Sequence, residues 1–297
     1  MTNLPETQNA YSEEAVFAAL VPRDLDASFP GAVFRALYLP SFHPEALITV
    51  AIAPDGTGEV SIASFDRNLW YALGERQRRG PASGKAPPSM PVRWEEFGGL
   101  RRGLSGELLR AAADLEVAGG ERRHGLDGMR LVGEIRPGAG AEPRRFDAWS
   151  PHPGDKLHTY FAALHRVATD VLWADRAVRR LEQLHGYLRL GLPVRDLGGK
   201  PRRIRIFGAL SSRDEGALRE LFGALRRDVP MIVDMGNFDG MGTALYPVFQ
   251  DFMARPGPIL WIASDRARGH LRDIGVVDSQ IVEDVAEALA RLARGAT

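Results

Sequence analysis

The residues best suited to chemistry lie in a turn between an apolar strand and a helix. The strand is expected over residues 231–235, and it is followed by Asp239-Gly240-Met241-Gly242 and then Thr243. The two glycines allow the backbone to turn tightly and to approach a ligand closely. Backbone N–H groups at a helix start suit a phosphate, but the carboxylate of Asp239 would repel that anion. The sequence therefore favours a contact surface over a nucleotide site.

Histidines and carboxylates offer metal chemistry as a second possibility. His158 and His165 are seven residues apart, so both would lie on one face of a helix, with Asp155 nearby. Seven residues rise about 10 Å along a helix, which is too far for one ion without outside ligands. We therefore expect a polar helix edge here, with no metal and no cofactor.

Catalysis is the alternative from another class. An enzyme would place its site between the two halves of the chain and would use His152, Asp155 or Asp127. Clustering of these side chains in one concave pocket would favour that alternative. The sequence contains no G-x-S-x-G, P-loop or dinucleotide-binding glycine pattern. We predict no catalytic residue and a protein that is not an enzyme.

The elements around the turn alternate between strand and helix. Residues 192–197 and 203–207 predict a hairpin across Gly198-Gly199, and the rest predicts parallel α/β units. Pro247 predicts a kink in the helix after the turn, or a later start for it. The further elements are expected at 213–226 (helix), 259–263 (strand), 267–274 (helix), 280–282 (strand) and 284–292 (helix).

Residues 191–294 resemble a STAS domain, the family of anti-sigma factor antagonists and of cytoplasmic domains of sulfate transporters. Ile232-Val233-Asp234-Met235 is similar to the family's V-L-D-L strand, and Asp239-Gly240-Met241-Gly242 falls where the family has D-S-S-G. Upstream, Gly208-Ala209-Leu210-Ser211-Ser212 and then Leu218-Arg219-Glu220-Leu221 are similar to the family's G-E-L-D and L-R-E-L segments. The resemblance implies a mostly parallel sheet and a regulatory role in binding another protein.

One departure from the family pattern concerns its phosphorylation switch. Where switchable members carry a phosphorylated serine, this chain has Met241, and Gly240 replaces the serine before it. A thioether cannot accept a phosphoryl group, so we expect constitutive recognition, with Met241 either as adaptable apolar surface or packed in the core. Thr243 carries a hydroxyl, which at a first helical turn more often caps the helix. The expected partner-binding residues are Phe238, Asp239, Gly240, Met241, Gly242, Thr243 and Tyr246.

The first half of the chain predicts an α+β domain over residues 1–154. Strands are expected at 32–39, 46–52, 59–63, 129–135 and 145–149, with helices at 12–20 and 105–116 and a mobile loop at 74–93. This half resembles an uncharacterised bacterial domain through Phe42-His43-Pro44, Gly125-Leu126-Asp127-Gly128 and Trp149-Ser150-Pro151. That likeness implies a fold unit and no activity.

Residues 155–186 keep a helical apolar rhythm, which predicts one long helix that packs on the first sheet, connects the domains or forms a dimer seam. We therefore divide the chain into 1–154, the helix at 155–190, and a STAS-like domain at 191–297.

Composition bounds the remaining possibilities. The chain has 297 residues, no cysteine and a formal net charge of zero, which excludes disulfides and thiolate chemistry and gives no overall field for nucleic acid or an anionic membrane. No apolar run reaches the length of a membrane span, and the first residues lack a secretory signal. We expect a cytoplasmic α/β regulator whose partner is an anti-sigma factor, a switch kinase or another signalling component, with a homodimer possible. The third alternative is an immunity-type or structural protein that uses its STAS-like part only for dimerisation.

Overall fold

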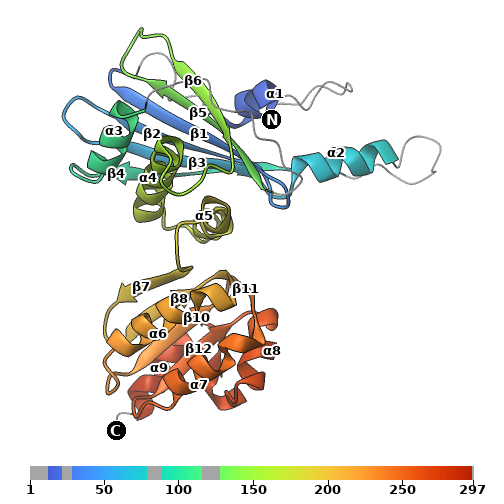
Figure 1. Cartoon of the computed structure of the whole chain (residues 1–297), viewed down its shortest axis with the longest axis vertical. Coiled ribbons are helices and arrows are strands. Elements are labelled where there is room, and N and C mark those ends of the chain that lie inside the picture. The colour runs from blue at the N-terminus through green and yellow to red at the C-terminus, as the bar shows by residue number, and fades with distance from the viewer. Residues whose placement is uncertain (1–12, 22–28, 79–88, 116–127, 296–297) are drawn as a thin grey trace. The chain divides into compact units, whose positions relative to one another are not determined.

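The chain has an α/β fold, as the sequence predicts, and divides into two compact units. The computed structural model describes residues 13–21, 29–78, 89–115 and 128–295. The first unit is Met1–Arg189 and the second is Leu190–Thr297, so the boundary falls after the helical residues that follow the first sheet. Figure 1 shows the elements of each unit.

The first unit is built on an antiparallel sheet with the strand order β4-β3-β2-β1-β5-β6. Every neighbouring pair in this sheet runs antiparallel, which agrees with the expectation from the alternating strand patterns. The strands are β1 (Ala32–Pro40), β2 (Ala46–Ile52), β3 (Gly58–Phe65), β4 (Arg93–Leu100), β5 (Met129–Arg136) and β6 (Arg144–Trp149).

Helices pack on this sheet because each strand presents side chains to both faces. On one face, Val16 and Leu20 of α1 join a core with Leu37, Leu47 and Phe65. On the other face, the Tyr160 ring of α4 meets Phe146 of β6 edge to face at 5.2 Å. The helices are α1 (Glu13–Leu20), α2 (Leu69–Arg78), α3 (Gly106–Ala113), α4 (Lys156–Val171) and α5 (Asp175–Leu188).

The predicted long helix over 155–186 is wrong, because the chain breaks it into α4 and α5. Leu172 and Ala174 adopt extended conformations between the two helices. Nε2 of His158 lies 2.7 Å from the carbonyl oxygen of Leu188, and Nε2 of His165 lies 2.9 Å from that of Leu181. His158 and His165 are seven residues apart, and so are Leu181 and Leu188. The same contact therefore recurs after two turns along the antiparallel pair of α4 and α5. The apolar rhythm continues through the break and therefore hides it.

The loop expected at 74–93 is also corrected, since α2 continues to Arg78 and β4 begins at Arg93. The start of α2 is capped from outside the helix: the Glu45 carboxylate accepts hydrogen bonds from the N–H groups of Leu69 at 2.9 Å and Trp70 at 3.4 Å. Asn68 adds a local cap, since its Oδ1 accepts a hydrogen bond from the Tyr71 N–H at 2.9 Å, so the sequence did carry a signal for this helix start. The middle of the expected loop and Asp127 lie outside the described residues.

The second unit is built on a mostly parallel sheet with the strand order β13-β12-β10-β8-β7. Strands β8, β10, β12 and β13 are parallel, and β7 pairs antiparallel with β8 as the predicted hairpin. These strands are β7 (Val194–Gly198), β8 (Arg202–Ile206), β10 (Met231–Met235), β12 (Ile259–Ala263) and β13 (Ile281–Val282). At one edge of the sheet, β13 is only two residues long.

Helices cover both faces of this sheet. The larger core joins α6 (Glu215–Ala224), α7 (Tyr246–Met253) and α8 (Asp265–Asp273) to residues such as Val233 and Trp261. The smaller core joins α9 (Val285–Gly295) to Ile232 and Leu260, which point to the opposite face because they are neighbours of those strand residues.

The turn expected after β10 contains a short strand. Strand β11 (Phe238–Met241) pairs in parallel with β9 (Gly208–Leu210), outside the main sheet. A 3-10 turn over Thr243–Leu245 then leads into α7, with Pro247 in its first turn. The later helix start, one of the two outcomes expected for this proline, is therefore confirmed.

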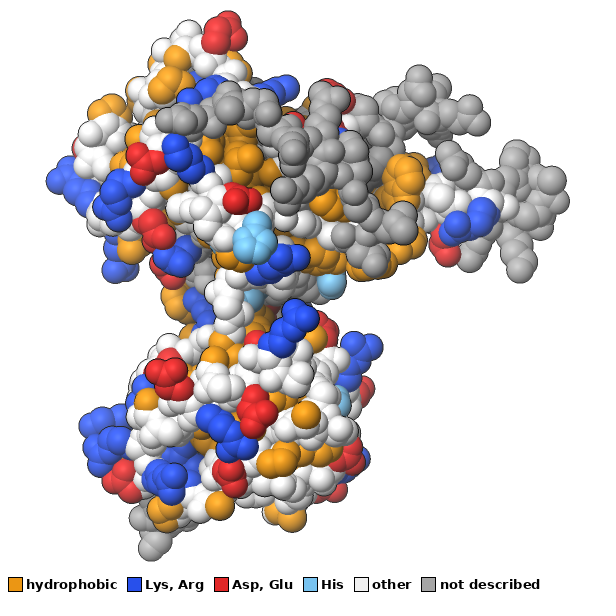
Figure 2. Space-filling view, viewed as in Figure 1, with side chains coloured by type: hydrophobic (Ala, Val, Ile, Leu, Met, Phe, Trp, Pro, Cys, Tyr) orange, Lys and Arg blue, Asp and Glu red, His pale blue; other side chains and the backbone are white. Residues whose placement is uncertain are grey.

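Charge and hydropathy are mixed over the surface. On the face drawn in Figure 2, basic and acidic side chains are interspersed over both units, in keeping with the formal net charge of zero. Within the described ranges, no helix combines the length and apolar character needed to cross a bilayer.

Candidate functional site

The segment predicted to bind a partner is anchored by two of its own apolar side chains. Phe238 is 2 % exposed and Met241 is 8 % exposed, and both belong to the larger core of the second unit. Phe238 and Met241 are three residues apart, and the irregularity in the pairing of β11 with β9 lets both side chains enter the core while Asp239 between them is exposed. Of the two alternatives for Met241, the structure therefore shows core packing, and the contact surface is left to the neighbouring residues.

The exposed positions of this segment are Asp239, Gly242 and Thr243, with Gly240 partly exposed. Gly240 has a φ of +147° beside an irregularity in the pairing of β11 with β9, a conformation that residues with a side chain rarely adopt. The N-cap of the 3-10 turn is Gly242 and that of α7 is Leu245, so Thr243 does not have the capping role considered for it. Its hydroxyl is therefore presented to solvent.

Helix α8 supplies the polar groups that face this segment. The Tyr246 hydroxyl donates a hydrogen bond to Oδ2 of Asp273 at 3.1 Å and lies 3.0 Å from Nδ1 of His270. Because the hydroxyl has one proton, it accepts from an Nδ1–H group on His270. Nε2 of His270 lies 3.5 Å from the position that a Cβ at Gly240 would occupy.

The same helix also holds the backbone and the rings of the segment. The His270 ring packs edge to face on Phe238 at 5.9 Å and on Tyr246 at 6.0 Å. Nη1 of Arg266 donates to the carbonyl oxygen of Asp239 at 3.3 Å. We call the resulting patch the β11–α7 surface, and it consists of Asp239, Gly240, Gly242, Thr243, Tyr246, Arg266, His270 and Asp273.

The electrostatics of this surface are centred on Tyr246. Partial burial, and then the hydrogen bond to Asp273 and its negative charge, raise the pKa of the Tyr246 hydroxyl above its ordinary value of 10.0. The group is therefore a neutral hydrogen-bonding residue at physiological pH. With a carboxylate, an imidazole and a guanidinium beside it, the surface offers donors and acceptors to a macromolecule.

Two of the three residues named for the enzyme alternative, His152 and Asp155, are exposed. His152 and Asp155 lie together on an exposed turn at the start of α4, where Oδ2 of Asp155 accepts a hydrogen bond from the His152 N–H at 2.9 Å. This contact fixes the turn before the helix, and Asp127 lies outside the described residues. Among the side chains that the structure describes, no group of three or more His, Asp or Glu residues could hold a metal ion.

Sequence reasoning did not find Arg266, His270 and Asp273. They follow β12, which lies beside β10 in the parallel sheet. The carboxyl ends of neighbouring parallel strands meet at one edge, so residues after β12 belong beside residues after β10. This strand order could have predicted that the segment after β12 contributes to the site. It could not have predicted which side chains of that segment do so.

Comparison of the chain with protein-family models finds no matching family, and comparison with curated proteins finds no match.

Proposed function

We propose that the protein is a non-catalytic, cytoplasmic regulator whose second unit binds a protein partner through the β11–α7 surface. The resemblance of residues 191–294 to STAS domains suggests an anti-sigma factor, a switch kinase or another signalling component as the partner. The observation that carries the proposal is an exposed polar segment fixed from two sides, by Phe238 and Met241 in the core and by Arg266 and Tyr246 through hydrogen bonds.

Rigidity is useful to a binding surface because the ordering of side chains and loops opposes association. The Tyr246 ring is held by hydrogen bonds to two residues of α8 and packs against His270, so it needs little further ordering when a partner arrives. Tyrosine is also enriched at interfaces, where it combines an apolar body with a polar end.

Binding at this surface is proposed to be constitutive. The position that carries the phosphorylated serine in the resembling family is the buried thioether of Met241. A residue that cannot be phosphorylated and does not reach the surface leaves no place for that switch. Regulation would then come from the abundance or state of the partner.

Co-purification from native cells followed by quantitative binding to the recovered partner tests the proposal. Thr243→Arg and Asp239→Arg should each weaken binding at least tenfold, because both place a bulky cation on the surface without disturbing a buried group. Glu220→Arg is the matched control, since Glu220 is exposed on α6 and lies outside the surface.

Equal affinities of the Thr243→Arg, Asp239→Arg and wild-type proteins would exclude the β11–α7 surface as the binding site. A partner recovered through the first unit alone would have the same consequence.

A further inference from the structure

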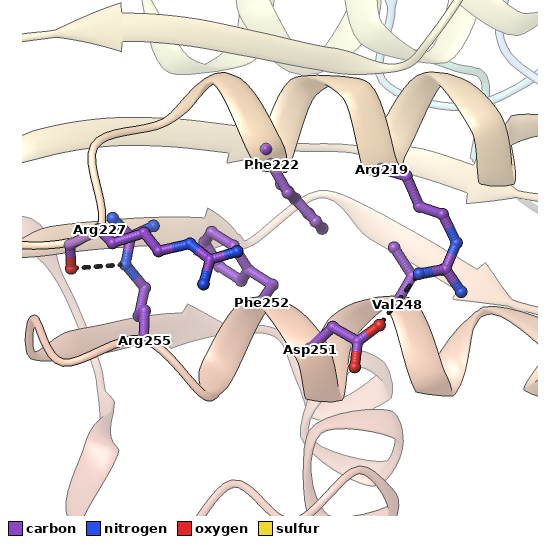
Figure 3. A pocket seen from close by; sticks show the side chains of 8 residues that line it. Arg219, Phe222, Arg227, Val248, Asp251, Phe252 and Arg255 are labelled. Carbon is purple, nitrogen blue, oxygen red and sulfur yellow. Dashed lines mark hydrogen bonds and ion pairs between the residues drawn. The ribbon is translucent and has the colours of Figure 1, made fainter.

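A separate pocket lies between α6 and α7 on the second unit. Its volume is about 190 Å³, and it is lined by Arg219, Phe222, Gly223, Arg227, Val248, Asp251, Phe252 and Arg255. Figure 3 shows the arginine side chains along this groove and the phenyl rings of Phe222 and Phe252 between the helices. None of these residues belongs to the β11–α7 surface.

The floor of the pocket is apolar. The rings of Phe222 and Phe252 stack with their centroids 4.1 Å apart and their planes inclined by 23°. Both rings are buried in the core, as is Val248, so they are held in place from below. Phe222 stacks on the Phe252 ring and the Arg255 guanidinium lies 5.2 Å over that ring, so a flat apolar group would meet only those parts of the two rings that line the pocket.

Positive charge is concentrated at one end of the pocket. Arg219, at the opposite end, is neutralised, since it bonds Oδ2 of Asp251 at 3.0 Å and Oε1 of Glu215 at 3.1 Å. At the positive end, the Arg255 guanidinium bonds the backbone carbonyl oxygens of Arg226 and Arg227 and does not pair with a carboxylate of a described residue. Arg227 itself forms no side-chain hydrogen bond or ion pair with any residue in the described ranges.

The two cations at this end influence each other. Burial and then the neighbouring charge of Arg227 lower the pKa of Arg255. Asp228 opposes this effect, but its carboxylate is already paired with Arg226 at 2.8 Å. An added anion would therefore relieve the repulsion between Arg227 and Arg255.

We propose that the α6–α7 pocket binds a small organic oxyanion, a carboxylate or phosphate ester attached to a single flat ring. Arginine recognises both oxyanions through paired N–H donors. The volume fits one ring, because a cavity of about 150 Å³ in another protein holds benzene. The oxyanion would contact Arg227 and Arg255, and the ring would contact the parts of Phe222 and Phe252 that line the pocket.

The test is a calorimetric titration of the full-length protein at low salt with phenyl phosphate, benzoate, inorganic phosphate and benzyl alcohol. Phenyl phosphate or benzoate should bind saturably and at least tenfold more tightly than either inorganic phosphate or benzyl alcohol. The stronger of the two ring anions identifies the oxyanion. If inorganic phosphate bound as tightly as the ring anions, the ring would not contribute to binding and the proposal would fail. If benzyl alcohol bound as tightly, the anion would not contribute and the proposal would likewise fail.

Two pairs of variants locate the site. Arg227→Gln should weaken binding at least tenfold, while Arg213→Gln, with the same loss of charge at an exposed residue outside the pocket, should change it less than twofold. Gly223→Leu should block the pocket, because Gly223 lines it and has open space around its Cβ position. Gly216→Leu is its control, since this other glycine of α6 also has open space and does not line the pocket.

Retention of full affinity in Gly223→Leu would overturn the proposal, as would equal losses in Arg227→Gln and Arg213→Gln or the absence of saturable binding to the wild type. None of these results concerns the β11–α7 surface, so the two proposals fail separately.

Discussion

The Tyr246 hydroxyl bridges two residues of α8, since it lies 3.0 Å from Nδ1 of His270 and donates to Asp273 at 3.1 Å. This relationship predicts the titration of Tyr246. Asp273→Asn removes the negative charge that helps to raise the pKa of the tyrosine, so the pKa should fall toward 10.0. The tyrosinate absorbance measures this change, with Tyr246→Phe identifying the contribution of Tyr246.

The sign of the associated stability follows from the raised pKa. The folded protein holds the Tyr246 proton more tightly than the unfolded chain does. This contribution is complete below the ordinary tyrosine pKa of 10.0 and is lost as pH rises through the folded-state pKa. A tyrosine titration that is identical in the wild type and in Asp273→Asn would refute the assigned hydrogen bond.

The histidines of α4 should be structural. His158→Phe leaves the carbonyl oxygen of Leu188 without its 2.7 Å donor, and we expect a loss of about 1–2 kcal/mol in the free energy of unfolding. His152→Phe, on the exposed turn, should change it by less than about 0.5 kcal/mol. Urea denaturation measures both, and a thermal midpoint raised by Zn²⁺ in the wild type but not in His158→Phe would contradict the structural role.

Strand β4 and the end of α4 approach each other so closely at Gly98 that only a residue without a side chain fits there. A Cβ at Gly98 would lie 2.6 Å from Cγ1 of Val171 and 2.9 Å from its carbonyl oxygen. Gly98→Ala should therefore destabilise the first unit by about 1–3 kcal/mol through overpacking. The neighbouring Gly99 has open space at its Cβ position, so Gly99→Ala is the control and should cause no such loss. Equal thermal midpoints for the two variants would show that α4 does not pack here.

The buried carboxylate of Glu134 joins two arginines. It lies 2.7 Å from Nη1 of Arg35 and 2.8 Å from Nε of Arg145, and its side chain is 5 % exposed. Glu134→Gln should lower the free energy of unfolding by about 3 kcal/mol, because Arg35 keeps a buried charge after losing this partner. Glu107→Gln breaks the exposed pair with Arg166 and should cost less than about 1 kcal/mol. Equal falls in the denaturant midpoints of Glu134→Gln and Glu107→Gln would show that Glu134 is exposed to solvent.

Two buried tyrosines should make the first unit sensitive to alkali. Burial raises the pKa of Tyr38 and of Tyr160, so unfolding releases their protons above pH 10 and stability falls there. Among the described residues the Tyr38 hydroxyl has no hydrogen-bond partner, so Tyr38→Phe should preserve stability at neutral pH. It should also reduce the alkaline slope by about 1.4 kcal/mol per pH unit.

Tyr160→Phe is the comparison, because its hydroxyl shares its one proton between the carbonyl oxygens of Arg35 at 3.3 Å and Glu134 at 3.4 Å. Removing this hydroxyl should cost about 1 kcal/mol at neutral pH. A stability loss in Tyr38→Phe as large as that in Tyr160→Phe would show that Tyr38 has a partner.

Local patterns predict many strands and helices of this chain. Strand β10 and strand β12 have the predicted bounds, because their apolar runs are set off by Pro230 and by Pro258. The break between α4 and α5 was not predictable in the same way, since both helices bury the same kind of apolar stripe. Helix α2 has a local N-cap in Asn68, which the sequence could have shown, and a second cap from Glu45, which only the folded chain brings to it.

The candidate site was predictable in part. The sequence places Asp239 and Thr243 after a buried strand, and they are exposed. Phe238 and Met241 are three residues apart, which does not match the period of two of a regular strand, so a turn was the simpler interpretation. The contributions of Arg266, His270 and Asp273 depend on which strands are neighbours in the sheet. The α6–α7 pocket depends on two helices meeting, which no local pattern specifies.

The shortness of β13 has a consequence for assembly. A two-residue edge exposes few backbone groups that another chain could pair with, whereas a long free edge is a template for aggregation. Copies of the second unit therefore gain little by adding strands to this edge, and the sheet is protected there against growth into an open polymer.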